Sequence, residues 1–264
     1  YLDRDRKLLR ESPEILARAL QSVIAEHPDF LLVSGDLTKD GERVNHELAA
    51  KMLGTVEAAG IKVFVINGNH DINNPDAMRF SGEKTEAVPG IDPAGFAAIY
   101  ADFGYAEAID RDPASLSYVV EPVPGLWLLA IDSCRYDTNY ADGEPVIPGR
   151  LDGHRLAWVE ETLLRARAEG KAVIGMQHHG MVEHYPSQEQ YYGEYLLDDH
   201  DAIGRMYADL GLRVVFTGHF HANDVALRDY GQAGRLYDVE TGSLVTWPSP
   251  VRHMSGDANG TLHI

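Results

Sequence analysis

The most constraining feature of the sequence is the polar segment Asn-Gly-Asn-His-Asp at residues 67–71, which directly follows the apolar run 61–66. The run has the length and composition of a buried strand, so the polar residues stand at its carboxyl end. Open α/β sheets bind their ligands outside the carboxyl ends of their strands. Asn-Gly-Asn is also ordinary turn chemistry, because both residue types tolerate positive φ. The segment therefore indicates a functional site only if other strands end in the same way.

Three further apolar runs, at residues 30–33, 172–176 and 212–216, lead to side chains that can bind metal. These side chains are Asp36, His178, His179, His219 and His221. A helix predicted between the first two strands makes a β-α-β unit, which places Asp36 and Asn69 on the same edge. We expect all four groups to converge on one edge of one sheet. Carboxylate, amide and imidazole ligands suit Mn, Fe or Zn, and the absence of thiolates argues against a structural zinc site.

The rest of the sequence predicts one α/β domain over residues 1–264, because no linker interrupts the pattern. Ser12 is the expected N-cap of the first helix, with Pro13 at its first position. We expect helices from Ser12 to about His27 and over residues 42–59, 94–103, 152–169 and 199–210. We expect a hairpin over 115–121 and 126–131, two or three strands over 222–246, and loops at 73–93, 135–150 and 181–195.

The formal net charge of −18 argues against a groove for nucleic acid, because the surface would repel a polyanion. A small anionic substrate is compatible with this charge, since a bound metal ion dominates locally. No apolar run approaches the roughly 18 residues of a membrane span, so we predict no transmembrane segment. The single Cys134 rules out an internal disulfide. Exported and cytoplasmic locations both remain open.

The ordered motifs of this chain resemble those of the calcineurin-like metallophosphoesterase superfamily, and most of all bacterial members similar to cyclic-nucleotide phosphodiesterases and purple acid phosphatases. The motifs are Gly35-Asp36, Gly68-Asn69-His70-Asp71, His178-His179 and Gly218-His219-x-His221. The resemblance implies a four-layer α/β/β/α sandwich of two mixed sheets flanked by helices, with a site for two metal ions. It also implies that Asp36 bridges both ions. Asn69, His178 and His219 then hold one ion, and His221 holds the other.

The chain departs from the family pattern in two places. The family's Asp-x-His motif on a first strand is not found ahead of the helix at Ser12, so we expect the domain to lack its first strand in this chain. Lys39 stands where the family often has an Asp that orients the catalytic His, and Asp40 or Asp71 can take that role. In relatives with paired histidines the first is usually the ligand, which favours His178 and leaves His179 near the substrate.

The expected function is metal-dependent hydrolysis of a small phosphodiester or phosphomonoester by a hydroxide that two ions activate. His70 is the candidate general acid for the departing alkoxide, with Asp71 as the neighbouring carboxylate. The alternative is a non-catalytic metal- or phosphate-binding module with a degenerate site. A two-metal hydrolase of an amide bond is disfavoured by the Gly-Asn-His-Asp motif. Tyr185, Tyr191 and Tyr192 could stack on a ring of the substrate, although loop aromatics more often pack the loop itself.

Overall fold

The computed structural model describes residues 6–82, 84–257 and 260–264. Its α-helices are α1 (Ser12–Glu26), α2 (Arg43–Glu57), α3 (Pro93–Ile99), α4 (Asn139–Asp142), α5 (Gly153–Ala168), α6 (Gln188–Tyr192) and α7 (His200–Leu210). Its first seven strands are β1 (Phe30–Val33), β2 (Lys62–Val65), β3 (Met78–Ser81), β4 (Lys84–Ala87), β5 (Asp110–Arg111), β6 (Tyr118–Val123) and β7 (Leu126–Ile131). The others are β8 (Ala172–Gln177), β9 (Val214–Thr217), β10 (Asp224–Asp229), β11 (Arg235–Glu240), β12 (Ser255–Gly256) and β13 (Leu262–His263).

The largest element is a seven-stranded mixed sheet with the order β10-β11-β9-β8-β7-β6-β5. Its central strands β11, β9, β8 and β7 run parallel, and both edges pair antiparallel, β10 with β11 and β6 with β7. The predicted hairpin over 115–121 and 126–131 is confirmed by the antiparallel pairing of β6 with β7, and β7 also pairs in parallel with β8. Parallel strands point their carboxyl ends to one edge, so the segments after β8 and β9 begin side by side.

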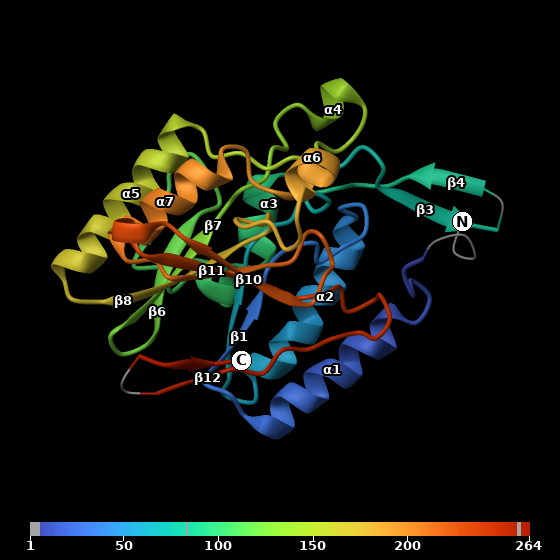
Figure 1. Cartoon of the computed structure of the whole chain (residues 1–264). Helices are drawn as coiled ribbons and strands as arrows, with labels where there is room; N and C mark the ends of the chain where they lie inside the picture. Colours follow the sequence, from blue (N-terminus) through green and yellow to red (C-terminus); the bar gives the residue numbers. More distant parts are fainter. Residues whose placement is uncertain (1–5, 83, 258–259) are drawn as a thin grey trace.

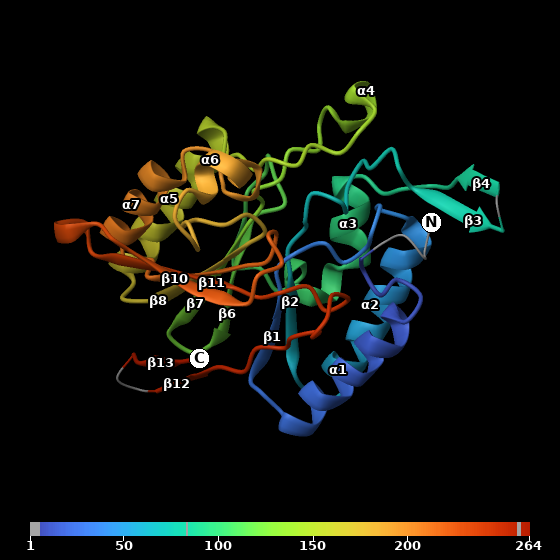
Figure 2. The same cartoon turned by 45° about the vertical axis from the view of Figure 1, so that its right-hand side comes forward.

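A second layer of sheet consists of β1 and β2, which pair in parallel from Phe30 with Lys62 to Val33 with Val65. Helix α2 connects them and buries the residues His46, Ala49, Leu53 and Val56, which recur at helical spacing along one face. Figure 2 shows α1 and α2 on the outside of this pair, the seven-stranded sheet on its other side, and α5 and α7 beyond that sheet. Among the described residues only the seven-stranded sheet is mixed, whereas β1 and β2 form a purely parallel pair.

Alternation along β7 divides the interior into two hydrophobic cores. Leu128 and Ala130 pack in the core that faces α1, α2 and β2, whereas Trp127, Leu129 and Ile131 pack in the core under α5 and α7. A strand places successive side chains on opposite faces, so one apolar run supplies both cores. The seven-stranded sheet is thus buried on both faces in its centre, which explains why β7, β8 and β9 lack polar alternation.

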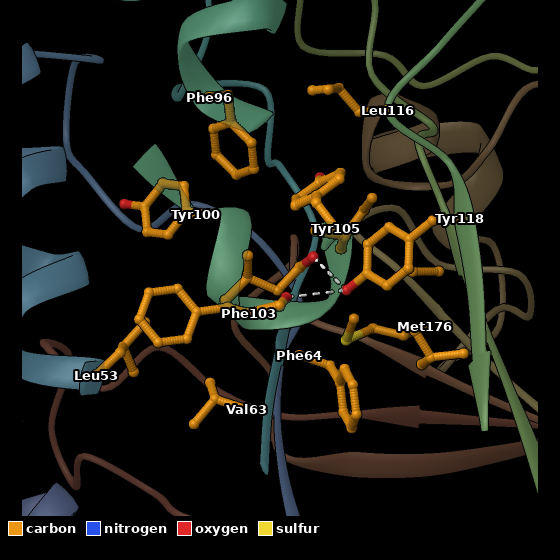
Figure 3. Packing of buried hydrophobic residues seen from close by; sticks show 14 of the residues in the cluster. Leu53, Val63, Phe64, Phe96, Tyr100, Phe103, Tyr105, Leu116, Tyr118 and Met176 are labelled. Carbon is orange, nitrogen blue, oxygen red and sulfur yellow. Dashed lines mark hydrogen bonds between the residues drawn. The ribbon is translucent and has the colours of Figure 1, made fainter. Parts of the chain in front are cut away.

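Tyr118 joins the seven-stranded sheet to the β1–β2 pair. Its side chain is fully buried, and its hydroxyl donates to the carbonyl oxygen of Val65 at 2.7 Å and to that of Phe103 at 3.4 Å. Figure 3 shows Tyr118 pointing from its strand toward Phe103 across the core. A buried carbonyl at the end of β2 is thereby satisfied by a side chain from another sheet.

Several expectations about local structure are wrong, and the loops predicted at 135–150 and 181–195 contain the short helices α4 and α6. The predicted loop 73–93 contains the antiparallel hairpin β3–β4, which extends away from the domain in Figure 1. Its strands carry few buried side chains, so no apolar alternation marks them in the sequence. Ser12 is the first residue of α1, and its hydroxyl donates to the carbonyl oxygen of Leu9, so it does not cap the helix.

In the part of the chain that the structure describes, every helix is too short or too polar to cross a membrane.

The hydroxyl of Tyr118 predicts a measurable loss of stability on its removal. Tyr118→Phe should lower the free energy of unfolding by about 1–2 kcal/mol, because the carbonyl oxygen of Val65 loses its donor inside the core. Urea unfolding measures the change. Tyr140→Phe is the control, since Tyr140 is 61% exposed and its change should stay within about 0.5 kcal/mol. Equal stability of both variants would show that the bond to Val65 contributes nothing.

Candidate metal centre

Asp36, His178 and His219 form a cluster in which one donor atom from each residue lies within 4.8 Å of the others. Asp36 follows β1, His178 directly follows β8, and His219 lies two residues past β9. The expectation that all groups meet at one edge of one sheet is therefore wrong. The cluster lies where the carboxyl ends of two different sheets face each other, and each sheet supplies part of it.

The tautomer of His178 leaves one ring nitrogen directed at the cluster. Its Nδ1 lies 2.8 Å from the carbonyl oxygen of Ser34, which can only accept, so Nδ1 carries a proton. Its Nε2 lies 3.2 Å from Oδ1 of Asn69 and 3.5 Å from Oδ2 of Asp36. In a neutral ring, the lone pair on Nε2 would face the lone pairs of these oxygens, and they would repel each other. The contact is favourable only with a proton or a metal ion between them.

Charge in the cluster is balanced by the histidines around Asp36. Burial alone would raise the pKa of Asp36, but His178 and His70 hold it well below its usual range. Burial opposes the charged form of His178, yet Asp36 raises the pKa of His178 above its ordinary value. The pKa of His219 is lowered well below its ordinary value by burial and by the neighbouring histidines. His219 is therefore held as a neutral imidazole, the form that binds metal.

Two buried nitrogens of the cluster have no hydrogen-bond partner among the described residues. They are Nε2 of His219 and Nδ2 of Asn69. Buried polar atoms are normally paired, and unpaired ones mark strain or a missing ion or ligand. One carboxylate, one amide and two imidazoles are also a suitable donor set for Mn, Fe or Zn. The residues present therefore fit a metal ion.

The glycines of the two sequence motifs allow this close approach. Gly35 has φ +99°, and a Cβ on it would lie 2.6 Å from the backbone nitrogen of Gly68. A Cβ on Gly68 would collide with the side chain and backbone of Asp36. The loops after β1 and β2 thus touch through backbone, which only glycine permits. Asp36 itself has a positive φ of 52° at this contact.

Asp71 binds backbone groups of both loops. Its carboxylate accepts from the N–H groups of Leu37, Thr38 and Gly68 at 3.3, 3.0 and 2.8 Å. The Thr38 hydroxyl donates to it at 3.2 Å. These donors account for both carboxylate oxygens, so Asp71 positions the loops that carry Asp36 and Asn69.

His70 lies beside the cluster with its ring at the edge of the site. Its backbone N–H donates to Oδ1 of Asp36 at 3.1 Å. Its Nδ1 lies 3.8 Å from Oδ1 of Asp40 and makes no hydrogen bond to the described residues. Of the two carboxylates that the sequence offered for orienting His70, the geometry therefore favours Asp40 over Asp71.

The remaining two candidate histidines do not belong to the cluster of three, although the ring of His179 lies 4.5 Å from that of His219. Both ring nitrogens of His179 are occupied, Nδ1 by the Ser133 hydroxyl and Nε2 by the Ile147 carbonyl oxygen, each at 2.8 Å. Burial lowers the pKa of His179 to about 3. His221 lies outside the cluster of three and has a positive φ of 63°. The geometry thus favours His178 over His179 and does not bring His221 to the same point.

Two further buried residues, Asp132 and His46, support the site, and only His46 was missed in the sequence. Asp132 accepts from Nδ2 of Asn67 at 2.9 Å and from the Tyr136 hydroxyl at 2.7 Å, which fixes the strand end before Gly68. His46 on α2 has its Nε2 3.0 Å from the Asp71 carbonyl oxygen. Periodicity marks His46 as a buried helix position, but no local pattern shows what its ring contacts.

Two carboxylates on β11, Asp238 and Glu240, hold the loops that follow β8 and β9. Asp238 accepts from the N–H groups of Met181 and Val182 at 2.5 and 3.1 Å, and Glu240 accepts from Ala222 N–H at 3.3 Å. Both carboxylates are almost fully buried. They lie on one face of the strand, because their positions differ by two.

His184 supplies the positive charge opposite this pair. Its Nε2 lies 3.4 Å from Glu240 and 3.7 Å from Asp238, and its Nδ1 lies 3.0 Å from Asp224. Burial opposes the charged ring, but these carboxylates raise the pKa of His184 to about 9. Burial and Asp238 raise the pKa of Glu240 to about 7. The loop after β8 is therefore fastened by an ion pair that persists at neutral pH.

This ion pair predicts a pH dependence of stability. A raised pKa means that the folded state binds the His184 proton more tightly than the unfolded state does. The contribution is complete below the unfolded pKa of about 6.5 and disappears as pH rises through about 9. Glu240 titrates lower, with a pKa of about 7, so above pH 8 it is largely ionised in both the folded and the unfolded state and adds little to this pH dependence.

We expect the urea midpoint of unfolding to fall between pH 8 and pH 10, and to fall less in His184→Gln. His154→Gln, which changes an exposed histidine, should keep the fall of the unchanged protein. The same fall in all three proteins would contradict the assignment to His184.

The chain is similar to proteins of known family and fold. The family model described as calcineurin-like phosphoesterase matches residues 11–223. A protein of Ruthia magnifica subsp. Calyptogena magnifica, described as a probable cyclic nucleotide phosphodiesterase, is 39% identical over 59 residues. This match covers 22% of the chain and 24% of the relative, so it spans about a quarter of that protein.

Two solved structures share the fold at low sequence identity. A dimetal phosphatase from Danio rerio has a TM-score of 0.59 at 14% identity, covering 91% of this chain and 80% of that one. A purple acid phosphatase from yellow lupin seeds has a TM-score of 0.54 at 12% identity, covering 91% and 42%. Together with the family match over most of its length, these findings show that the chain belongs to the calcineurin-like phosphoesterase family.

Proposed function

We propose that this protein is a hydrolase that cleaves a small phosphomonoester or phosphodiester at a centre of two metal ions. The observation that carries the proposal is the convergence of Asp36, His178 and His219, whose donor atoms lie within 4.8 Å of one another. Family membership supports phosphoester hydrolysis. The descriptions of the similar proteins include both phosphatases and a phosphodiesterase, so both ester classes belong to the proposal.

Asp36, Asn69, His178 and His219 would hold the first ion. Asp36 has two oxygens and would share one with a second ion, which His221 would help to hold. When bound, the ions polarise the phosphoryl oxygens and lower the pKa of water toward about 7. The neutral Asn69 keeps the net charge of the centre positive, which favours a phosphate anion.

His70 is the proposed general acid. Its backbone is fixed on Asp36, and its ring stands at the edge of the centre beside Asp40. A proton on this ring can pass to the ester oxygen that leaves, and the Asp40 carboxylate lies 3.8 Å from its Nδ1. Asp71 contributes by holding the loops of Asp36 and Asn69 in place. Asp71 was expected to lie beside the ring of His70, but Asp40 is the carboxylate near that ring.

The fold belongs to the same proposal. We infer that residues 1–264 form a single domain with the four-layer α/β/β/α arrangement of the family, in which β1 and β2 are part of the second mixed sheet. The order of layers in Figure 2 and the two cores on the faces of β7 support this arrangement.

Metal binding tests the first ion without any requirement for turnover. Calorimetric titration with Mn²⁺ or Zn²⁺ should show binding by the unchanged protein. Asp36→Asn should weaken the affinity by more than 100-fold, which exceeds the 10- to 100-fold typical of a supporting residue. Asp209→Asn is the control, because Asp209 is exposed near the end of α7. Unchanged affinity in Asp36→Asn would contradict the assignment of the centre.

Hydrolysis of bis(4-nitrophenyl) phosphate in the presence of Mn²⁺ tests the reaction. His70→Ala should lower kcat by about 10²- to 10⁴-fold for esters of weakly acidic alcohols. The loss should be smaller for 4-nitrophenyl esters, because that leaving group departs without a proton. His154→Ala should have no effect, since His154 is exposed on α5.

These outcomes distinguish a phosphoester hydrolase from a non-catalytic binding module. An equal loss for both leaving groups would contradict the role of His70 as a general acid. Metal binding without turnover of any ester would favour the alternative function, a non-catalytic metal- or phosphate-binding module.

A further inference from the structure

Four aromatic side chains form a continuous cluster beside the candidate metal centre. They are Tyr185, Tyr192, Tyr195 and Phe220, which we call the aromatic wall. The ring of Phe220 lies in its middle, with centroid distances of 5.8 Å to Tyr185, 5.9 Å to Tyr192 and 5.1 Å to Tyr195. Three rings come from the segment 181–195 after β8, and the fourth comes from the segment after β9.

The aromatic wall is attached to the candidate ligands themselves. Phe220 stands between His219 and His221 in the sequence. The ring of Tyr195 lies 4.8 Å from the ring of His219. His219 has an unpaired Nε2 at the centre. A phosphoryl group bound at this centre would therefore lie close to Tyr195, which joins the aromatic wall to His219.

The rings of the wall are only partly covered by protein. Tyr192 is 47% exposed, and Tyr185, Tyr195 and Phe220 are half-buried, in contrast to fully buried rings such as Tyr118. The exposed parts of these rings favour contact with a ligand, because a ligand that covers them removes water from apolar surface. Packing of the loop alone does not require a contribution from Phe220, which belongs to another segment.

The wall is also held in place before any ligand arrives. The segment 181–195 is fastened at Met181 and Val182 by Asp238, and at His184 by the ion pair with Glu240. The N–H of His184 further donates to Gln188, whose side chain is buried. A preformed surface loses little entropy when it binds a ring, so stacking on it contributes fully to affinity.

The charge of the protein indicates where the affinity for substrate must come from. A formal net charge of −18 repels a phosphate anion at long range. Short-range contacts with the ion and with the organic part of the ester must therefore supply the binding energy. Aromatic side chains stack on the face of any planar ring, without a requirement for particular hydrogen bonds.

We propose that the aromatic wall binds a planar ring carried by the substrate, so that the protein acts on aryl or nucleobase-bearing phosphoesters in preference to small alkyl phosphates. The inference rests on the proposed function, because it places the phosphate of that substrate at the metal centre. Tyr192 and Tyr185, whose rings both contact Phe220, are the specificity-determining residues.

Three phosphonates that are not hydrolysed provide the test. Methylphosphonate, cyclohexylmethylphosphonate and benzylphosphonate share one anionic group, and only the last carries a planar ring. Calorimetric titration of the full chain loaded with Mn²⁺ should show benzylphosphonate binding about 10-fold tighter than methylphosphonate, within the range of one stacking contact. Cyclohexylmethylphosphonate should gain less, because it cannot stack.

The variants assign this preference to the wall. Tyr192→Ala and Tyr185→Ala should each lower the ratio of benzyl to methyl affinity by about 5-fold or more. Tyr192→Phe should keep the ratio, because it keeps the ring. Tyr191→Ala is the matched control, since Tyr191 is 68% exposed and adjoins Tyr192 without belonging to the wall, and it should keep the ratio as well.

A ratio near one in the unchanged protein, or an equal weakening of all three ligands in Tyr192→Ala, would overturn the inference. The measurement needs no turnover, so the two proposals fail separately. A protein that shows the preference but hydrolyses no ester overturns only the proposed reaction. A protein that hydrolyses esters without the preference overturns only the role of the wall.

Discussion

The geometry of the candidate centre depends on one buried carboxylate, Asp71. It joins the loops after β1 and β2 through three backbone N–H groups, and its own carbonyl oxygen is held by His46 of α2. Burial raises the pKa of Asp71, whereas His46 and the N–H groups of Gly68 and Thr38 oppose this rise. Loss of this group would leave three buried donors unpaired, at about 1–3 kcal/mol each. Asp36 and Asn69 keep their positions because these loops cannot separate.

The sequence was sufficient to predict where the strands end. It was not sufficient to predict which sheet each strand joins. Apolar runs before Asp36 and His178 are local signals, and they predicted the strands that deliver both residues. The assignment of all groups to one sheet failed, because a β-α-β unit fixes which strands are neighbours but not where a second sheet packs. The hairpin β3–β4 was missed for a different reason, since its exposed strands bury almost nothing and leave no alternation.

The burial of the supporting carboxylates on β11 could not be predicted from the local sequence either. Asp238 and Glu240 alternate with apolar residues along β11, which is the pattern of an exposed acidic face. They are buried because a segment more than 50 positions earlier folds over them and supplies Met181, Val182 and His184. The choice between Asp40 and Asp71 as partner of His70 was open for a similar reason. Both follow a strand end, and only the turn of the chain brings Asp40 to the ring.

Buried aspartates recur at three of the loops that carry candidate ligands. Asp71 binds the loops of Asp36 and Asn69, Asp132 binds Asn67 before the second of these, and Asp238 binds the segment after His178. Each carboxylate accepts N–H groups that a loop would otherwise present to water, so the loops are rigid at the point where ligands must be placed. Part of the large negative charge is therefore internal and structural. The same charges surround the centre with a negative field that favours a cation, so the bonds that fix the loops also prepare the site for metal.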